Sequence, residues 1–376
     1  MNWQNGSLWD PAQAIPETFY ELYESIYRRH LPRAHPESKA LIAFQFSHEH
    51  DYFKTGKAWM ALRPNQIRLC GFIQEGITLK GQKVGYFGFW ETTENLSLNQ
   101  ELFAKLEAWM RAEGVTYLVG PVNFTTFGHY RLRDAAAPED LVFLDEPLSP
   151  SYYEKFIEAC GFQKIERYSS LFVHPHPNLR QYFEELYQKL HTGPLADYQL
   201  LPLNAATWQA NIRDFYELTL RIFGGNPAFV PISFGDYQRY YGEYTARSLC
   251  PHSSLLVRDA RDELVGYVSS YPDYGPLLSL EQGRYRLEEL NFERCFAELP
   301  YRTQIGKTVG IVPEHRGQGL QFLMTAKSAI QAFSAGYDSI VLALMREGNV
   351  SQKVKPPFPV GERHYSLYGK PLGSPT

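Results

Sequence analysis

Apolar residues near the C-terminal end of the chain follow first a strand pattern and then a helix pattern. Residues 308–312 form a short apolar, β-branched run, which Pro313 ends. After a glycine-containing turn, apolar residues recur three or four positions apart, as on one face of a helix. These residues are Leu323, Ala326, Ile330 and Phe333. Gly336 supplies a helix stop, and a second strand is predicted at residues 339–344. The predicted unit is strand, glycine turn, helix, strand.

The same order of elements is predicted once more, earlier in the chain. A strand at residues 84–90 precedes a helix that Gly114 ends, and a strand follows at residues 117–119. The apolar side of that helix consists of Leu98, Leu102, Leu106, Trp109 and Met110. A repeated order of elements indicates an internal duplication. We therefore predict two related domains, residues 1–178 and residues 179–376.

The remaining pattern mixes helices and strands, which predicts an α/β fold with an α+β mixed sheet. One helix begins at Pro16, and another carries aligned apolar residues from Trp208 to Ile222. Further helices are expected at residues 151–160 and 179–190. Further strands are expected at residues 40–46, 58–63, 67–73, 166–173, 198–203, 254–259, 263–271 and 364–370.

The turn before the C-terminal helix has the features of an anion site. It reads Arg316-Gly317-Gln318-Gly319. Glycines let the backbone approach a ligand, and the first amides of a helix have no carbonyl partners within the helix. These amides and the helix dipole suit a phosphate or pyrophosphate, and Arg316 adds a positive charge. A tight turn without a ligand is the alternative.

The order of residues around this turn resembles motif A of the GNAT superfamily, the acyl-CoA-dependent N-acyltransferases. The matching run is Ile311-x-Pro313-Glu314-x-Arg316-Gly317-x-Gly319-Leu320, and Gln321 stands where a small residue is usual. The resemblance implies acetyl-CoA or another acyl-CoA as co-substrate. It implies that the acyl-CoA is bound by Gly310, Ile311, Val312, Arg316, Gly317, Gln318, Gly319 and Leu320, with Asn349 near the pantetheine.

At whole-chain level the sequence looks like a family of bacterial two-domain GNAT proteins, which implies tandem GNAT-like domains. The first copy lacks the glycine turn and has Glu91 and Glu94 there instead. Two carboxylates at that place would repel a pyrophosphate. We therefore expect a degenerate first domain, and one acyl-CoA site in the second.

The resemblance also implies the reaction, in which an amine attacks the thioester directly in a ternary complex. An amide near residues 310–312 would polarise the thioester carbonyl. No carboxylate occurs between Pro300 and Pro313, so the strand offers no general base. Asp273 or an ordered water relay is a candidate base. The candidate acids for the leaving thiolate are Ser351, Tyr365 and Tyr368, and a core position for Tyr368 is the alternative.

Residues 228–250 are rich in aromatics, and two interpretations stay open. These aromatics are Phe229, Phe234, Tyr237, Tyr240, Tyr241 and Tyr244. They belong either to a helix core or to a lid over the acceptor site, where GNAT folds place such helices.

Composition narrows the possible partners. The chain has 376 residues, 44% of them hydrophobic, and a net charge of −4 without a basic run, which argues against a nucleic-acid ligand. No apolar run is long enough to cross a membrane, and the four cysteines are widely spaced. His174 and His176 alternate with prolines in a linker, so no metal site is expected. We expect a cytoplasmic protein.

Three functions remain possible. The first is an N-acyltransferase that acts on a small-molecule amine, and acetyl transfer is the reaction that we expect of it. The second is a binding or regulatory module that has kept a CoA pocket without catalysis, which the missing strand carboxylate and Gln321 favour. The third is a Fem-type aminoacyl-tRNA-dependent transferase, which the lack of a basic stripe argues against.

Overall fold

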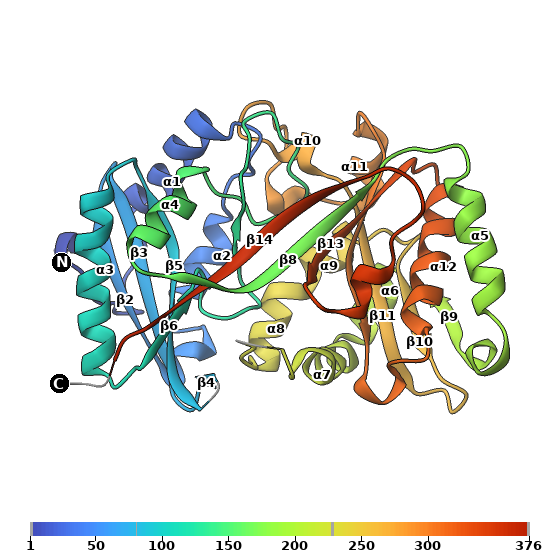
Figure 1. The fold of residues 1–376 in the computed structure, drawn as a ribbon, viewed down its shortest axis with the longest axis horizontal. Coiled ribbons are helices and arrows are strands. Elements are labelled where there is room, and N and C mark those ends of the chain that lie inside the picture. The colour runs from blue at the N-terminus through green and yellow to red at the C-terminus, as the bar shows by residue number, and fades with distance from the viewer. Residues whose placement is uncertain (1–2, 80, 227–228, 374–376) are drawn as a thin grey trace.

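A single sheet runs through both halves of the chain in the computed structural model, which describes residues 3–79, 81–226 and 229–373 (Figure 1). In spatial order its strands are β1 (Ser7–Leu8), β2 (Gly56–Arg63), β3 (Ile67–Gln74), β5 (Gln82–Thr92), β6 (Tyr117–Gly120), β14 (Val360–Pro371), β8 (Gln163–Val173), β13 (Ser339–Arg346), β12 (Thr303–Ile311), β11 (Leu264–Pro272), β10 (Leu255–Arg258) and β9 (Gln199–Pro202). The short strands β4 (Thr78–Leu79) and β7 (Leu132–Arg133) pair with β5 and β14. The predicted mixed α/β class is confirmed.

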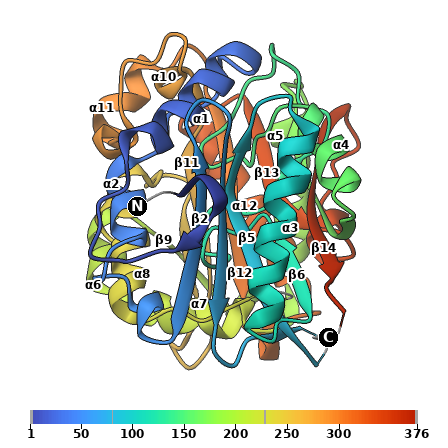
Figure 2. The same ribbon diagram turned by 90° about the vertical axis from the view of Figure 1, so that its left-hand side faces the viewer.

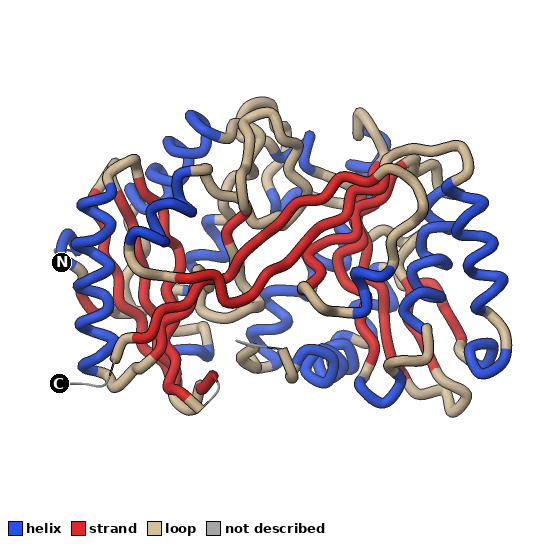
Figure 3. The backbone as a smooth tube through the Cα atoms, viewed as in Figure 1, coloured by secondary structure: helices blue, strands red, loops and turns tan. Residues whose placement is uncertain are grey.

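The two halves exchange their last strands in the middle of this sheet. β8 ends the first half, yet Phe172 pairs with Val341 of β13 in the second half. β14 ends the second half, yet Gly369 pairs with Val119 of β6 in the first half. β8 and β14 also pair with each other, and they cross diagonally between the halves (Figure 3). The chain division expected at residue 178 therefore does not divide the sheet, because each half completes the other.

Helices cover both faces of the first half. α1 (Glu17–His30) buries Phe19 against one face, and α3 (Leu96–Ala112) buries Leu102 against the other (Figure 2). This follows from strand alternation, because neighbouring residues of a strand point to opposite faces. On β2, Met60 packs in the cluster of Phe19, and Trp59 packs in that of Leu102. The predicted stop at Gly114 is confirmed by its φ of +77°.

The sheet of the second half is also covered on both faces. α7 (Ile212–Phe223) packs over Gly310, where an added Cβ would meet Ile222 at 2.7 Å. α12 (Leu320–Ser334) packs over Gly266 on the other face and ends before Gly336, whose φ is +88°. The remaining helices are α2 (Lys39–Gln45), α4 (Tyr152–Ala159), α5 (Leu179–Leu190), α6 (Ala205–Ala210), α8 (Phe234–Tyr241), α9 (Glu243–Ser248), α10 (Gly275–Leu278) and α11 (Phe292–Cys295). No helix in the described part of the chain is both long and apolar enough to span a membrane.

Two elements differ from the sequence prediction. Residues 40–46 were predicted as a strand, but residues 40–45 belong to helix α2 and Phe46 is its C-cap. The N-cap of α2, Ser38, accepts a hydrogen bond from the Leu41 amide. A short apolar run fits either element, and the cap decides it here. The helix predicted from Trp208 to Ile222 is divided at Asn211 into α6 and α7. Of the aromatic stretch, residue 228 lies outside the described residues.

Candidate functional site

The parallel strands β12 and β13 separate after four paired positions and form a fork. They pair from Thr303 with Ser339 to Gly306 with Leu342. Beyond these residues β12 follows β11, and β13 follows β8. Irregularities mark the separation on both sides, because the register shifts at Lys307 and around Leu344, whose φ is +58°. Bulges of this kind often re-aim side chains next to active sites.

A cavity of about 610 Å³ opens at this fork and lies between the two halves. Gly306 to Val309 and Leu342 to Arg346 line it from the two strands of the fork. The first half contributes α2, Tyr168 and the loop residues 126–131. The fork and the first half therefore face the same space.

α8 and α9 supply much of the aromatic wall of this cavity. Tyr237, Tyr240, Tyr241 and Tyr244 all line it. Tyr240 is also bound to the first half, since its hydroxyl accepts a 2.9 Å hydrogen bond from Gln45. These tyrosines thus serve as core and as cavity wall, and a lid function stays a prediction.

The glycine turn has the geometry expected of an anion site. Gly317 and Gly319 have φ of +81° and +91°, and Gly319 is the N-cap of α12. No atom lies within 4 Å of a Cβ placed on Gly317. Within the described residues, the backbone amides of residues 317–321 donate to no protein acceptor. Free amides at the start of a fifteen-residue helix suit a phosphate.

Arg316 is held by the protein and does not point freely into the turn. Its Nε donates to the Ile311 carbonyl at 2.9 Å, and one Nη donates to the Ile222 carbonyl at 2.6 Å. The residue remains exposed, so its charge still lies beside the turn. It therefore ties the end of β12 to α7 as well.

The backbone of residues 310–312 is oriented differently from the expectation. The Val312 amide donates to the Val265 carbonyl of the neighbouring chain segment at 3.0 Å, and so it points away from the fork. Because amide directions alternate along a strand, Gly310 shares this direction, and Val309 and Ile311 face the fork. Of the three residues in the expected range, Gly310 and Val312 therefore direct their amides away from the fork, and Ile311 directs its amide toward it. The lack of a side chain at Gly310 serves the packing of Ile222.

Three other residues singled out in the sequence line the cavity. Asn349 and Ser351 follow β13 at its rim, and Gln321 comes from the first turn of α12. The Gln321 Nε2 is buried and has no hydrogen-bond partner among the described residues. Gln321 is thus placed to contact a bound molecule. Gln318 is exposed in the turn, and Leu320 is buried in the core.

Asp273 lines neither this cavity nor the smaller one described below. It follows β11 and is 5% exposed. It accepts hydrogen bonds from the Gly275 amide at 3.0 Å and the Tyr301 hydroxyl at 3.2 Å. Burial raises its pKa to about 7 against these hydrogen bonds. The pKa of Asp273 would suit a general base, but its carboxyl group does not lie at the fork.

Tyr365 and Tyr368 do not line the cavity, because β14 carries them toward the first half. Tyr368 is fully buried in the core cluster of Leu102, and its hydroxyl has no partner among the described residues. Tyr365 donates a 2.7 Å hydrogen bond to Glu146. Of the three candidate acids, only Ser351 reaches the cavity.

The corresponding fork of the first half is filled by the chain itself. β5 and β6 pair only from Val84 to Tyr86 of β5, and then they separate. The Val122 amide donates to the Phe87 carbonyl, and the Asn123 side chain accepts from the Phe89 amide, both at 2.7 Å. The segment after β6 therefore occupies the strand edge that is open in the second half.

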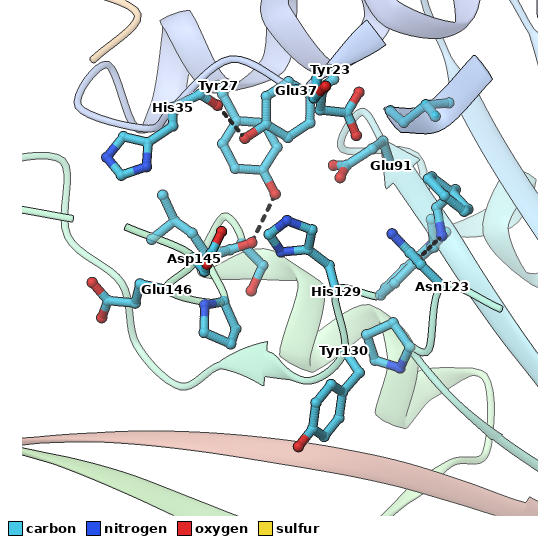
Figure 4. Close-up of a pocket in the computed structure, with 18 of the residues that line it drawn as sticks. Tyr23, Tyr27, His35, Glu37, Glu91, Asn123, His129, Tyr130, Asp145 and Glu146 are labelled. Atoms are coloured by element: carbon cyan, nitrogen blue, oxygen red, sulfur yellow. Dashed lines mark hydrogen bonds between the residues drawn. The ribbon is translucent and has the colours of Figure 1, made fainter. Parts of the chain in front are cut away.

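A second cavity of about 150 Å³ adjoins the large one within the first half. Glu37, Glu91 and His129 line it, and Figure 4 shows the His129 ring pointing into it. Burial raises the pKa of Glu91 to about 8, although Arg68 lies 3.7 Å away. The expected repulsion of a pyrophosphate by Glu91 is therefore wrong for this residue, which faces the interior.

Sequence reasoning missed the residues that the first half brings to the fork. Arg131 and Asp145 line both cavities, and Lys307 lines the larger one. The Lys307 Nζ donates to the Asp145 carbonyl at 3.2 Å. The sequence could have indicated Lys307 as a site residue, because a lysine within a mostly uncharged strand is unusual. For Arg131 and Asp145 the loop sequence offered none.

The architecture is similar to that of several solved structures. A tandem GNAT protein from the clavulanic acid biosynthesis pathway superposes with a TM-score of 0.52, at 13% identity over 98% of this chain and 99% of that one. The chain has the tandem GNAT fold. A GCN5-related glucosamine N-acetyltransferase region of a fungal multi-domain protein also matches, with a TM-score of 0.52 and 12% identity over 97% of this chain and 38% of that one. A probable N-acyltransferase from Enterococcus faecalis V583 matches with a TM-score of 0.50 and 9% identity, over 98% of this chain and 72% of that one. Neither the protein-family models nor the curated proteins yield a match.

The tandem GNAT fold accounts for the repeated unit in the sequence. Each half contributes a parallel pair with a helix between its strands, β5–α3–β6 and β12–α12–β13. The expected tandem GNAT-like architecture is confirmed as a fold. The two copies differ at the fork, which is filled in the first and open in the second.

Proposed function

We propose that this protein is an acyl-CoA-dependent N-acyltransferase, with acetyl-CoA or another acyl-CoA bound in the second half and a small-molecule amine as acceptor. One observation carries the proposal: the open fork of β12 and β13 lines a cavity and leads along β12 to the free amides of residues 317–321. An acyl-CoA has the matching shape, with a pantetheine that pairs like a strand and a pyrophosphate at the other end. The similar structures, which are a tandem GNAT protein, a glucosamine N-acetyltransferase region and a probable N-acyltransferase, agree with this class.

The acyl group would lie at the closed end of the fork, near Lys307. The Val309 amide faces the fork and lies in the cavity wall, so it is the donor that we assign to the thioester carbonyl. The amine nitrogen attacks the carbonyl carbon, the C–S bond breaks, and an amide and a CoA thiolate form. The amine loses a proton, and the thiolate takes one up.

Two groups near the fork can take part in these proton transfers. Burial lowers the pKa of the Lys307 ammonium, the carboxylate of Asp145 opposes the shift, and the charge of Arg131 adds to it. A lysine with a lowered pKa can accept a proton from the attacking amine. Ser351 lines the same cavity and is the candidate donor to the thiolate.

Titration calorimetry with CoA tests the binding part of this proposal. We expect one equivalent of CoA per chain, because the fork of the second half is open and that of the first half is filled by the chain itself. Gln318→Glu places a negative charge in the exposed turn and should weaken binding about tenfold or more. The control Gln209→Glu adds the same charge on an exposed position of α6 and should leave the affinity unchanged. Two equivalents, or no binding, would contradict the assignment.

Release of free thiol from acetyl-CoA in the presence of an amine library tests catalysis. Turnover with an amine supports the transferase. CoA binding without turnover across acyl-CoA and amine panels would instead favour the CoA-binding or regulatory module. The absence of a carboxylate on β12 is the observation that supports this alternative.

A further inference from the structure

Arg131 is a buried cation that forms no ion pair with any of the described residues. Arg131 is 8% exposed, and its Nε and one Nη have no hydrogen-bond partner in the described part of the chain. Its guanidinium lies 3.7 Å from the centre of the Tyr130 ring and 3.9 Å from that of Tyr168. Burial lowers its pKa to about 10, so it remains charged at neutral pH. A buried charge of this kind is costly unless it is paired.

No carboxylate of the described residues comes within 4.0 Å of this guanidinium, in contrast to the other buried arginines nearby. Arg133 is paired with Asp140 and Glu146, and Arg68 is paired with Glu37. These two arginines are therefore explained by the fold. The two tyrosine rings supply cation–π contacts to Arg131. The Tyr168 hydroxyl also interacts with the guanidinium, but the Nε and one Nη stay without a hydrogen-bond partner among the described residues.

The position of Arg131 points to a ligand other than the CoA phosphates. Arg131 lines both cavities, at the place where they adjoin. Its neighbour Tyr130 also lines both cavities, and Figure 4 shows the Tyr130 ring directed toward the crossing strands. The charge of Arg131 influences Lys307, at the closed end of the fork. The glycine turn lies at the other end of β12, at residues 317–319.

A planar guanidinium binds a carboxylate through two parallel N–H···O bonds. The large cavity also carries more cationic than anionic side chains. Its charged lining residues are Arg131, Arg239, Arg247, Lys307 and Arg346 against Asp145 and Glu288. Arg239, Arg247 and Arg346 already pair with Glu49, Glu243 and Glu166, so Arg131 is left as a cation that an anionic group on the bound molecule would pair.

We propose that Arg131 binds the carboxylate of the acceptor, and that the acceptor is an amine of the amino-acid class. The inference rests on the proposed function and names its substrate class. With the carboxylate on Arg131, the amine reaches toward the thioester at Lys307. The first half of the chain thus selects the acceptor, and the second half holds the acyl-CoA.

Matched pairs of acceptors test this in the wild-type protein. The twenty standard amino acids, their amides and the corresponding decarboxylated amines are assayed with acetyl-CoA by thiol release, and their effect on the melting temperature is measured with CoA present. We expect at least one amino acid to be acetylated, with kcat/KM about tenfold or more above that of its amide, because the amide lacks the charged partner. Equal use of the amide or the decarboxylated amine would overturn the inference and leave the transferase in place.

Variants separate recognition from structure. Arg131→Gln should remove the preference for the free carboxylate, mainly through KM, and should keep the CoA affinity of the wild type. Arg131→Lys should keep part of the preference for the free carboxylate. The control Arg180→Gln removes an exposed cation of α5, outside both cavities, and should keep the preference. An unchanged preference in Arg131→Gln would make the residue purely structural.

Two further outcomes decide the remaining cases. The same anionic group can belong to the acyl chain, so the assay is repeated with succinyl-CoA. A preference for succinyl-CoA that Arg131→Gln abolishes would overturn the acceptor assignment. If CoA binds but no amino acid is acylated or shifts the melting temperature, the inference is wrong whatever the acceptor is. If CoA itself does not bind, the proposed function fails first.

Discussion

The Nζ of Lys307 donates a 3.2 Å hydrogen bond to the backbone carbonyl of Asp145, which joins the fork of the second half to a loop of the first. Asp145 has a φ of +58°, and its carboxylate lies 3.8 Å from the same ammonium. The Lys307 side chain is 22% exposed, and Lys307 lines the large cavity. The closed end of the proposed acyl site is thus built by residues that are 162 positions apart.

Lys307→Met tests the proposed proton acceptor. It keeps an unbranched chain of similar length and removes the amine. We expect kcat to fall roughly a hundredfold, the low end for general base catalysis, with CoA affinity retained. Lys189→Met, on an exposed position of α5, is the control and should have no effect. Wild-type turnover in Lys307→Met would assign the proton transfer to another group.

Tyr368→Phe tests whether this tyrosine is the general acid of the sequence-based hypothesis or a core residue. Its buried hydroxyl has no partner among the described residues, so removing it should leave both turnover and the free energy of unfolding no lower than in the wild type. Tyr365→Phe on the same strand is the matched comparison, since it leaves Glu146 without a 2.7 Å hydrogen bond. That variant should lose about 1–3 kcal/mol. A large loss of turnover in Tyr368→Phe at unchanged stability would restore the catalytic role.

Asp273 should make stability depend on pH. Its pKa is raised from 3.8 to about 7 in the folded protein, so the folded state holds a proton that the unfolded state has lost. The free energy of unfolding should therefore decrease as the pH rises from about 4 to 7. Asp273→Asn should flatten this part of the profile, measured by denaturant titration. Because Asp273 lies outside both cavities, the pH dependence of turnover should not change. A shifted activity profile with an unshifted stability profile would favour its role as base.

The exchanged strands predict that the halves do not fold alone. A fragment of residues 1–178 lacks β14, which lies between β6 and β8, and a fragment of residues 179–376 lacks β8, which lies between β14 and β13. Each fragment exposes unpaired strand edges, which promote aggregation. We expect no cooperative thermal transition from either fragment. Co-expression of the two should restore folding and the binding of one CoA. A cooperative transition in fragment 1–178 alone would contradict this.

Local features of the site could be predicted from the sequence. The helix after residue 319 and the stop at Gly336 follow from side-chain spacing and from glycine conformations. The phosphate turn follows in the same way, because Gly317 and Gly319 need the positive φ that glycine adopts readily. These properties depend on residues a few positions apart, so the pattern along the chain is enough.

The partners of each strand were decided only by the tertiary structure. The sequence alone could not tell that the Val312 amide points to Val265, or that β14 carries Tyr368 into the other half. It also did not reveal that Asn123 fills the first fork while Arg131 enters the cavity of the second. Long-range pairing and the packing of loops depend on contacts between residues more than a hundred positions apart, and a strand pattern leaves those contacts open. The sequence therefore determined the repeated unit and its anion-binding turn, and the exchange of strands determined which side chains surround the acyl site.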